Sequence, residues 1–154
     1  MKIINELLSN RILLTGLFSW AVAQVLKTII YLAINKTLNF ERLVGDGGMP
    51  SAHSATVTSV ALSVGLYCSF DSPQFAIAAI MAIIVMHDAM GVRLETGKQA
   101  KAINDMMSLL NQMADSNTSP EVKLKEFVGH TPMQVLAGLI LGIVMGLVSY
   151  NLFS

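Results

Sequence analysis

Residues 133–153 read MQVLAGLILGIVMGLVSYNLF and contain no charged side chain. A helix needs about 20 mostly apolar residues to cross the hydrocarbon core of a bilayer, so this segment predicts a membrane-spanning helix. Residues 12–34, ILLTGLFSWAVAQVLKTIIYLAI, predict another with a single charge, Lys27. This second stretch is too long for the apolar region of a signal peptide and no small-residue cleavage site follows it, so we expect it in the mature protein.

The composition also favours a membrane protein. Apolar residues make up 53% of the 154 residues and charged residues only 13%, against roughly 25% charged in a typical soluble domain. This excludes a disordered chain, and the lone Cys68 excludes a disulfide scaffold. Ten basic residues balance ten acidic ones, so no net field draws the chain to nucleic acid, and the lipid bilayer is the expected partner.

Two shorter apolar segments lie between these spans. Residues 51–68, SAHSATVTSVALSVGLYC, are rich in Ser and Thr, and residues 73–86 read PQFAIAAIMAIIVM. Each is short for a lipid-exposed span, so we expect inner helices whose polar residues face the bundle. A tight turn at 69–72 joins them into a helical hairpin. The sequence therefore predicts an all-α, multi-pass bundle of about four transmembrane helices, as a single domain over residues 1–154.

The segment between the third and fourth spans, residues 93–131, is more polar. Within it, apolar residues at helical spacing predict an amphipathic helix on the membrane surface or folded over the bundle. Residues 115–120, DSNTSP, predict a loop. The apolar positions of the amphipathic helix are Ile103, Met106, Met107, Leu110 and Met113.

Three polar clusters are expected to meet on one side of the membrane, because an even number of spans places both termini on the other side. They are residues 45–55 (GDGGMPSAHSA), 87–99 (HDAMGVRLETGKQ) and 126–142 (EFVGHTPMQVLAGLILG). In the first cluster, glycines allow a sharp turn and Pro50 suits a helix start. The free N–H groups of such a helix start form a ready anion site.

Each feature also has a simpler interpretation. A histidine at a membrane interface is more often a hydrogen-bonded boundary residue than a catalyst, and Arg93 and Lys98 suit interfacial anchors. The spacing of Gly138, Gly142 and Gly146 indicates close helix packing, and their face could also support a homo-oligomer. A lone lysine within a span, however, costs roughly 2.5–3.5 kcal/mol on insertion scales. Two histidines that each open a helix on the same side, beside Arg and Lys, favour a functional site.

These clusters resemble the type 2 phosphatidic acid phosphatases (PAP2), which share a clan with vanadium haloperoxidases. Residues 50–54, PSAHS, are similar to the PSGH motif, and residues 129–138, GHTPMQVLAG, resemble the last motif. The match is closer to the divergent PAP2 branch, with its GGMPSSHSA, DA-x-GVR and GHTP motifs. Ala23-Gln24 and Lys27 also fit the first helix of that branch. The resemblance covers about residues 20–146 in the right order.

The resemblance implies a role for each matching residue. His130 is the nucleophile, and His53 protonates the leaving group. Gln134 stands where the family has the Asp that orients the nucleophile, with Asp88 as the next candidate. Phosphate binding falls to Lys27, Arg93, Gly48 and Ser51, with Asp88 and Lys98 in support.

The sequence departs from the wider family at two further places. Lys36 and Arg42 are six residues apart and Leu43 follows, where the family has a spacing of seven and then Pro. The family's Ser-Arg pair before the last histidine is missing, because residues 122–127 read VKLKEF. Lys36, Arg42 and Lys123 are therefore secondary candidates for phosphate binding.

The function implied is hydrolysis of a lipid phosphate or diphosphate by a metal-independent phosphatase, through a phosphohistidine and without a cofactor. The alternative is a PAP2-like protein that binds a phosphorylated lipid or anion without hydrolysing it, and a third interpretation is vanadate-dependent oxidation. The protonation of His53 stays open, because the helix start disfavours the cation and a phosphate dianion favours it.

The distribution of basic residues predicts the orientation. Positive residues concentrate on the cytoplasmic side of membrane proteins, so we expect an integral membrane protein whose active face is cytoplasmic and whose termini lie outside. Seven basic residues lie on the proposed active face and two on the other: Lys36, Arg42, Arg93, Lys98, Lys101, Lys123 and Lys125 against Lys2 and Arg11.

Overall fold

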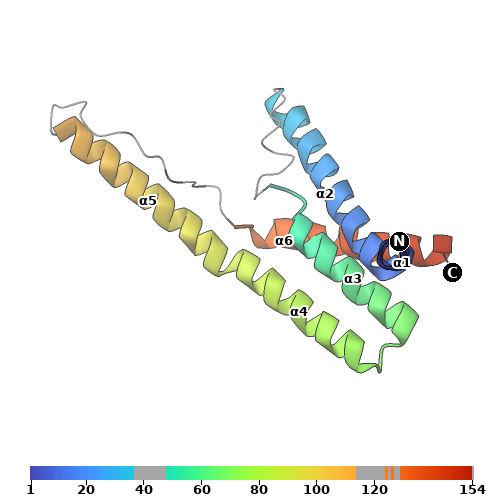
Figure 1. Ribbon diagram of the computed structural model, residues 1–154. Coiled ribbons are helices and arrows are strands. Elements are labelled where there is room, and N and C mark those ends of the chain that lie inside the picture. The colour runs from blue at the N-terminus through green and yellow to red at the C-terminus, as the bar shows by residue number, and fades with distance from the viewer. Residues whose placement is uncertain (37–47, 114–123, 125, 127–128, 154) are drawn as a thin grey trace.

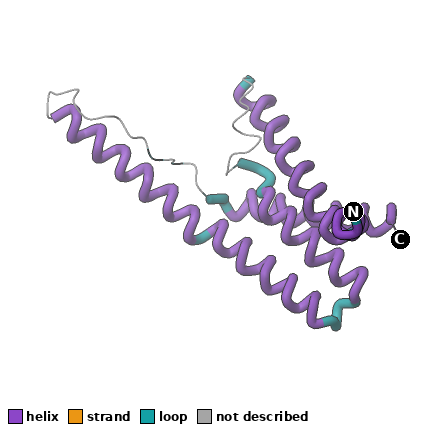
Figure 2. Tube along the Cα trace, in the orientation of Figure 1, coloured by secondary structure: helices purple, strands orange, loops and turns teal. Residues whose placement is uncertain are grey.

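The computed structural model describes residues 1–36, 48–113, 124, 126 and 129–153, and every regular element in these ranges is an α-helix (Figures 1 and 2). The all-α class expected from the sequence is therefore confirmed. The helices are α1 (Lys2–Ser9), α2 (Arg11–Asn35), α3 (Ala52–Cys68), α4 (Pro73–Met90), α5 (Val92–Met113) and α6 (Pro132–Phe153).

Local capping chemistry explains where the helices begin. The Asn10 side chain accepts a hydrogen bond from the Leu13 N–H at 3.1 Å and opens α2. In the α3–α4 turn, the Ser72 hydroxyl accepts one from the Phe75 N–H at 3.2 Å, and Pro73 takes the first helical position. Both arrangements satisfy N–H groups that have no partner within the helix. The helical hairpin with its turn at 69–72 is therefore observed as expected.

Helix α3 is the centre of the bundle, because it packs against α2, α4 and α6. Its 17 residues rise about 26 Å, less than the roughly 30 Å of a hydrocarbon core. Three stretches of the described chain are long and apolar enough to cross a membrane: Arg11–Asn35, Pro73–Met113 and Pro132–Leu152. The fourth helix in the expected count of about four is therefore the short inner helix α3.

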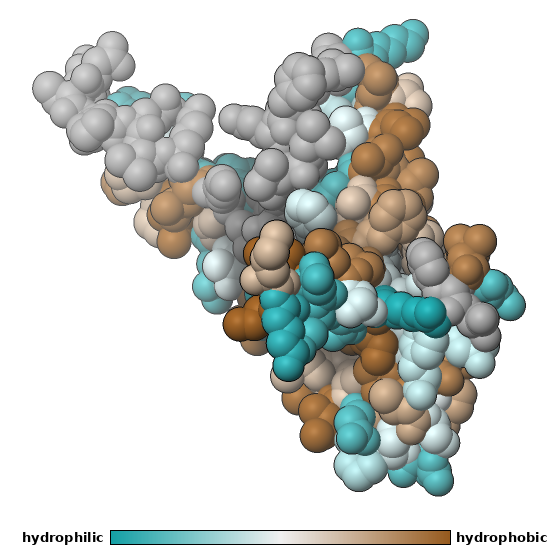
Figure 3. Space-filling view, turned by 45° about the vertical axis from the view of Figure 1, so that its right-hand side comes forward, coloured by the Kyte–Doolittle hydropathy of each residue, from teal (hydrophilic) through white to brown (hydrophobic). Residues whose placement is uncertain are grey.

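The bundle interior consists of small side chains, and the large apolar ones point outward. Ala23, Ala52 and Ala55 form the buried cluster between α2 and α3. In contrast, Phe18 is 64% exposed and Ile77 is 69% exposed, and brown apolar side chains cover much of the surface in Figure 3. Small residues let membrane helices approach closely, while hydrocarbon surrounds the large ones. This distribution is that of an integral membrane protein.

The glycines of α6 face α3 of the same chain. A Cβ at Gly138 would overlap the Ser51 carbonyl oxygen, and one at Gly142 would lie 2.6 Å from the Ala55 carbonyl oxygen. The three-glycine face of Gly138, Gly142 and Gly146 is thus covered within the chain. A homo-oligomer through this face, considered from the sequence, would have to displace α3.

Helix α5 continues the line of α4, from which a single residue, Gly91, separates it (Figures 1 and 2). The hydrogen bonds from Gly91 N–H to His87 O and from Glu95 N–H to Gly91 O, at 2.9 and 3.0 Å, preserve the helical direction. Among the described helices α5 contacts α4 alone, so the expected fold over the bundle is not observed. The loop expected at 115–120 lies outside the described residues.

Residues 124 and 126 lie against α5. The Asn104 side chain donates to the Leu124 carbonyl at 2.9 Å and accepts from the Leu124 N–H at 3.0 Å. It also donates to the Glu126 carboxylate at 2.9 Å. These three hydrogen bonds fasten residues 124 and 126 to α5.

Candidate functional site

Two histidines far apart in the sequence meet where α3 and α6 begin. The ring centroids of His53 and His130 are 6.0 Å apart, with the ring planes at 87°. His130 is 2% exposed, whereas His53 is half-buried. The pair therefore combines one buried imidazole with one that retains access from outside.

The start of α3 is fixed by serine hydroxyls. The Ser51 hydroxyl oxygen accepts from the Ser54 N–H at 3.3 Å and from the Ser54 hydroxyl at 3.0 Å. The Ser51 N–H donates to the Gln134 carbonyl at 3.0 Å and ties this helix start to α6. That N–H, expected from the sequence to bind phosphate, is therefore occupied. Within the described chain, the N–H groups of Ala52 and His53 have no hydrogen-bond partner, so they remain as anion donors.

Lys27 lies at the same site. Its side chain is buried, with 4% exposure, and a Cβ at Gly48 would lie 3.1 Å from its Cγ and 3.3 Å from its Cδ. Gly48 has a positive φ of 89°, which an L side chain rarely adopts. The glycine therefore permits both the turn and the close approach of Lys27. Helix α2 is continuous from Arg11 to Asn35. Lys27, in the middle of an unbroken helix, therefore reaches the turn at Gly48.

Arg93 and Asp88 flank the junction of α4 and α5. Arg93 Nε donates to Asp88 Oδ2 at 2.6 Å, and both side chains are partly exposed. Directly after Asp88, the Ala89 carbonyl accepts a hydrogen bond from the His130 N–H at 2.9 Å. This backbone bond connects the Asp88–Arg93 pair to the histidine pair.

Gly129 makes the turn into His130 possible. It has a positive φ of 91°, and a Cβ there would lie 2.5 Å from Leu94 Cα and 2.6 Å from the Arg93 carbonyl carbon. The chain can therefore cross the start of α5 only with glycine at this position. The glycine of the GHTP motif thus has a packing reason as well as a conformational one.

The remaining predicted residues have other surroundings. The Gln134 side-chain oxygen accepts from the Thr131 N–H at 3.0 Å and caps α6. Lys98 is 63% exposed and pairs with Glu95 at 2.7 Å along α5, so it is not brought to the histidines. Lys36 is exposed at the end of α2. Arg42 and Lys123 lie outside the described residues.

Gln24 is a residue that the sequence analysis matched to the first helix but did not place in the site. It lies one turn before Lys27 on α2 and is only 7% exposed. Its Oε1 has no hydrogen-bond partner among the described residues. A buried amide oxygen without a donor is costly, so Gln24 is suited to receive a donor from a ligand or water. The signal in the sequence is its i, i+3 spacing to Lys27.

The site contains cationic side chains and imidazole rings, which are suited to binding a phosphate. In the part of the chain that the structure describes, no group of three His, Cys, Asp or Glu side chains could hold a metal ion. A buried imidazole, a second imidazole, a buried lysine and a helix start are together equipped for phosphoryl transfer, which depends on positioning and charge stabilisation.

Comparison with known proteins gives a match at the level of family. The family model described as the divergent PAP2 family matches residues 8–145. The chain is also 40% identical over 151 residues to the uncharacterized membrane protein YuiD of Bacillus subtilis (strain 168). That alignment covers 93% of this chain and 96% of the relative. No solved structure matches the chain with significance.

Proposed function

The chain belongs to the divergent PAP2 family, and on that premise we propose that it is a membrane phosphatase that hydrolyses a lipid phosphate or lipid diphosphate. The observation that carries the proposal is the pair formed by His53 and His130, 6.0 Å apart, from the two matching motifs. The substrate is a lipid because the site lies in a bundle whose outer surface faces hydrocarbon.

In the first step, a ring nitrogen of His130 attacks phosphorus. An N–P bond forms, the bond from phosphorus to the leaving oxygen breaks, and His53 donates its proton to that oxygen. In the second step, a water molecule gives a proton to His53 while the water oxygen attacks phosphorus. The N–P bond breaks, inorganic phosphate leaves and both histidines return to their starting states. These steps require no metal and no cofactor.

Charge stabilisation comes from three directions. Lys27, buried against Gly48, faces the turn that precedes α3, and the Ala52 and His53 N–H groups point from the helix start. Arg93 contributes from the α4–α5 junction. Fixed donors in a water-poor site stabilise developing charge more strongly than water does. Lys98, exposed on α5, contributes only a screened, long-range field.

Phosphate release decides whether the protein is an enzyme. Purified wild-type protein in lipid nanodiscs is given a lipid monophosphate, a lipid diphosphate and a phosphodiester as control. We expect release of inorganic phosphate from the first two only, with an acid-labile phosphoprotein after a rapid quench. Binding of the same lipids without any release would instead favour the second candidate, a PAP2-like binding protein. The observation behind that candidate is Gln134, which caps α6 where the family has an orienting Asp.

Replacing Asp88 is expected to strengthen phosphate binding. Asp88 competes with a bound phosphate for Arg93, and the variant Asp88→Asn removes the charge but keeps the shape. A partly exposed pair contributes about 0–1 kcal/mol, so KM should fall up to about five-fold with kcat unchanged. Steady-state kinetics at low and high salt measure this effect, which salt should weaken. A loss of kcat with unchanged KM would instead make Asp88 the residue that orients His130.

Replacing Gln134 by glutamate is expected to be tolerated or to raise activity. The carboxylate of Gln134→Glu can still accept from the Thr131 N–H, and its charge suits both a helix start and an imidazolium-like intermediate. The kcat of this variant should equal or exceed that of wild type, with an unchanged unfolding temperature. If the folded variant loses activity, Gln134 does not orient His130.

We infer the orientation of the site from the distribution of the basic residues. Thr15 and Ser149 are hydrogen-bonded to each other, so the start of α2 and the end of α6 lie on one side. The positive-inside bias then favours a cytoplasmic face for His53 and His130. The substrate would be a lipid phosphate of the inner leaflet.

Cysteine labelling in intact cells tests this orientation. On a Cys68→Ser background, Asn5→Cys in α1 should react with an impermeant maleimide, and Gln112→Cys in α5 should react only after permeabilisation. Both positions are exposed on the protein, and reaction after permeabilisation shows that a position is reachable, so protection in intact cells then reports on the membrane side. The reverse pattern would place the site outside.

A further inference from the structure

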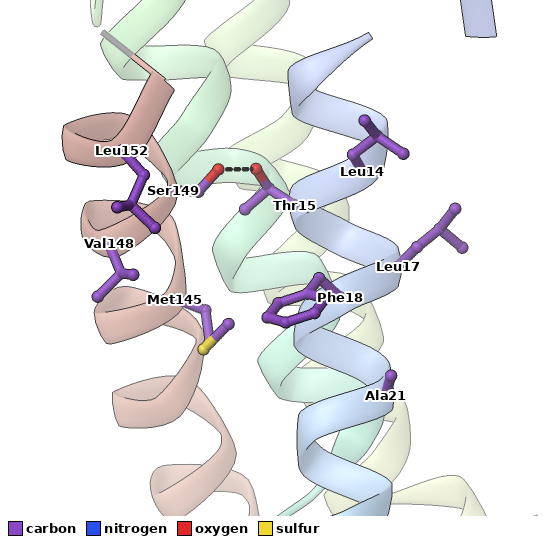
Figure 4. A pocket seen from close by; sticks show the side chains of 9 residues that line it. All are labelled: Leu14, Thr15, Leu17, Phe18, Ala21, Met145, Val148, Ser149 and Leu152. Atoms are coloured by element: carbon purple, nitrogen blue, oxygen red, sulfur yellow. Dashed lines mark hydrogen bonds between the residues drawn. The ribbon is translucent and has the colours of Figure 1, made fainter. Parts of the chain in front are cut away.

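A groove between α2 and α6 lies at the end of the bundle opposite to the histidine pair. Its volume is about 500 Å³, within the roughly 300–1,000 Å³ of ligand pockets. Figure 4 shows Phe18 and Met145 where the two helices face each other, with Leu14 above them on α2 and Leu152 above them on α6. The groove is therefore built from one end of each of two membrane-spanning helices.

The lining offers nothing to a polar ligand. Among the described residues that line it, Thr15 and Ser149 are the only polar side chains, and they are hydrogen-bonded to each other (Figure 4). The Thr15 hydroxyl also donates to the Arg11 carbonyl at 2.7 Å, so the Ser149 hydroxyl is the donor within the pair. Both hydroxyl protons are therefore used, and the rest of the lining is apolar. The ligand that fits is a hydrocarbon chain.

The depth of the groove indicates which leaflet supplies that chain. At about 1.5 Å per residue, Met145 lies about 22 Å along α6 from His130, and Leu152 about 33 Å. The midplane of a bilayer lies about 15 Å from either edge of the hydrocarbon core. The groove therefore belongs to the leaflet on the side of the termini, beyond the reach of a chain that fills only the other leaflet.

We propose that the groove binds an acyl chain of a phospholipid from the leaflet on the side of the termini. Arg11, the first residue of α2, is exposed one turn outside Leu14, and it puts a positive charge where the phosphate of that lipid would lie. The lining residues Leu17, Phe18 and Leu152 are exposed on the outer surface, so a chain can enter sideways from the bilayer. The bound lipid would add to the Thr15–Ser149 hydrogen bond in holding the ends of α2 and α6 together.

Native mass spectrometry tests this proposal. Delipidated protein in detergent is titrated with dioleoyl phosphatidylglycerol, and the adducts are counted. We expect one adduct to saturate well before the others. The variant Ala21→Phe places a ring in the groove and should weaken this first adduct about ten-fold or more. Ala76→Phe, the same change on an exposed face of α4, should leave it unchanged.

The variant Met145→Phe fills the groove from α6 and provides a second measurement if Ala21→Phe folds poorly. Equal adducts in wild type, both groove variants and the control would overturn the proposal. Phosphatase turnover separates the groove from the histidine site, because a filled groove should not change turnover of short-chain or long-chain substrates. A loss confined to long-chain substrates would assign the groove to the tail of the substrate and overturn the assignment to a separate lipid.

Discussion

Replacing His130 by alanine or glutamine is expected to lower phosphate release at least about 1,000-fold, because the proposed covalent intermediate cannot form without the nucleophile. The measurement is inorganic phosphate released by purified variants in nanodiscs. The matched control is His87→Gln, since His87 is exposed on α4 and has no role in the proposed steps. Turnover retained in folded His130 variants would contradict the mechanism.

Comparing the variants of His53 and His130 separates the role of general acid from that of nucleophile. A general acid contributes about 10²- to 10⁴-fold, and its contribution shrinks when the leaving group needs no proton. His53→Ala should therefore recover part of its activity on a nitrophenyl phosphate, whereas His130→Ala should not. Equal recovery of both variants would mean that the roles are not divided as proposed.

Replacing Gly138 by alanine is expected to destabilise the protein by about 1–3 kcal/mol, the usual cost of overpacking. The added methyl would overlap the Ser51 carbonyl oxygen and lie 2.9 Å from Ser54 Cβ. Relief would require α3 to move away from α6, which would also separate His53 from His130. We therefore expect a lower unfolding temperature together with lower turnover.

Gly146→Ala is the matched control on the same helix face. The three atoms nearest to its methyl would all belong to the side chain of Leu62, at 3.0 Å or more, and that flexible side chain can shift. Both variants gain the same helix propensity, about 0.5–1 kcal/mol relative to glycine, so their difference measures the packing of α3 on α6. If both variants unfold at the same temperature, close approach at Gly138 is not what positions the histidines.

The sequence by itself determined the class of protein and most helix bounds. Segments 12–34 and 133–153 became α2 and α6 with shifts of a residue at most, because an uninterrupted apolar stretch of that length has few alternatives to a helix in a bilayer. The turn at 69–72 followed equally directly from Ser72 and Pro73. The two motif histidines were candidates for the same reason: their neighbours, glycine and proline, specify the turns that open helices.

Only the tertiary structure decided how these pieces meet. Periodicity identified the apolar side of α5 but not its direction, which depends on hydrogen bonds across Gly91. The glycine spacing of α6 predicted close packing but not its partner, which is α3. Gln134 was expected near the nucleophile, yet its oxygen caps α6, and Gln24 is buried one turn from Lys27. The physical reason is that spacing along one helix specifies a face, whereas the group that this face meets depends on contacts between residues distant in the sequence.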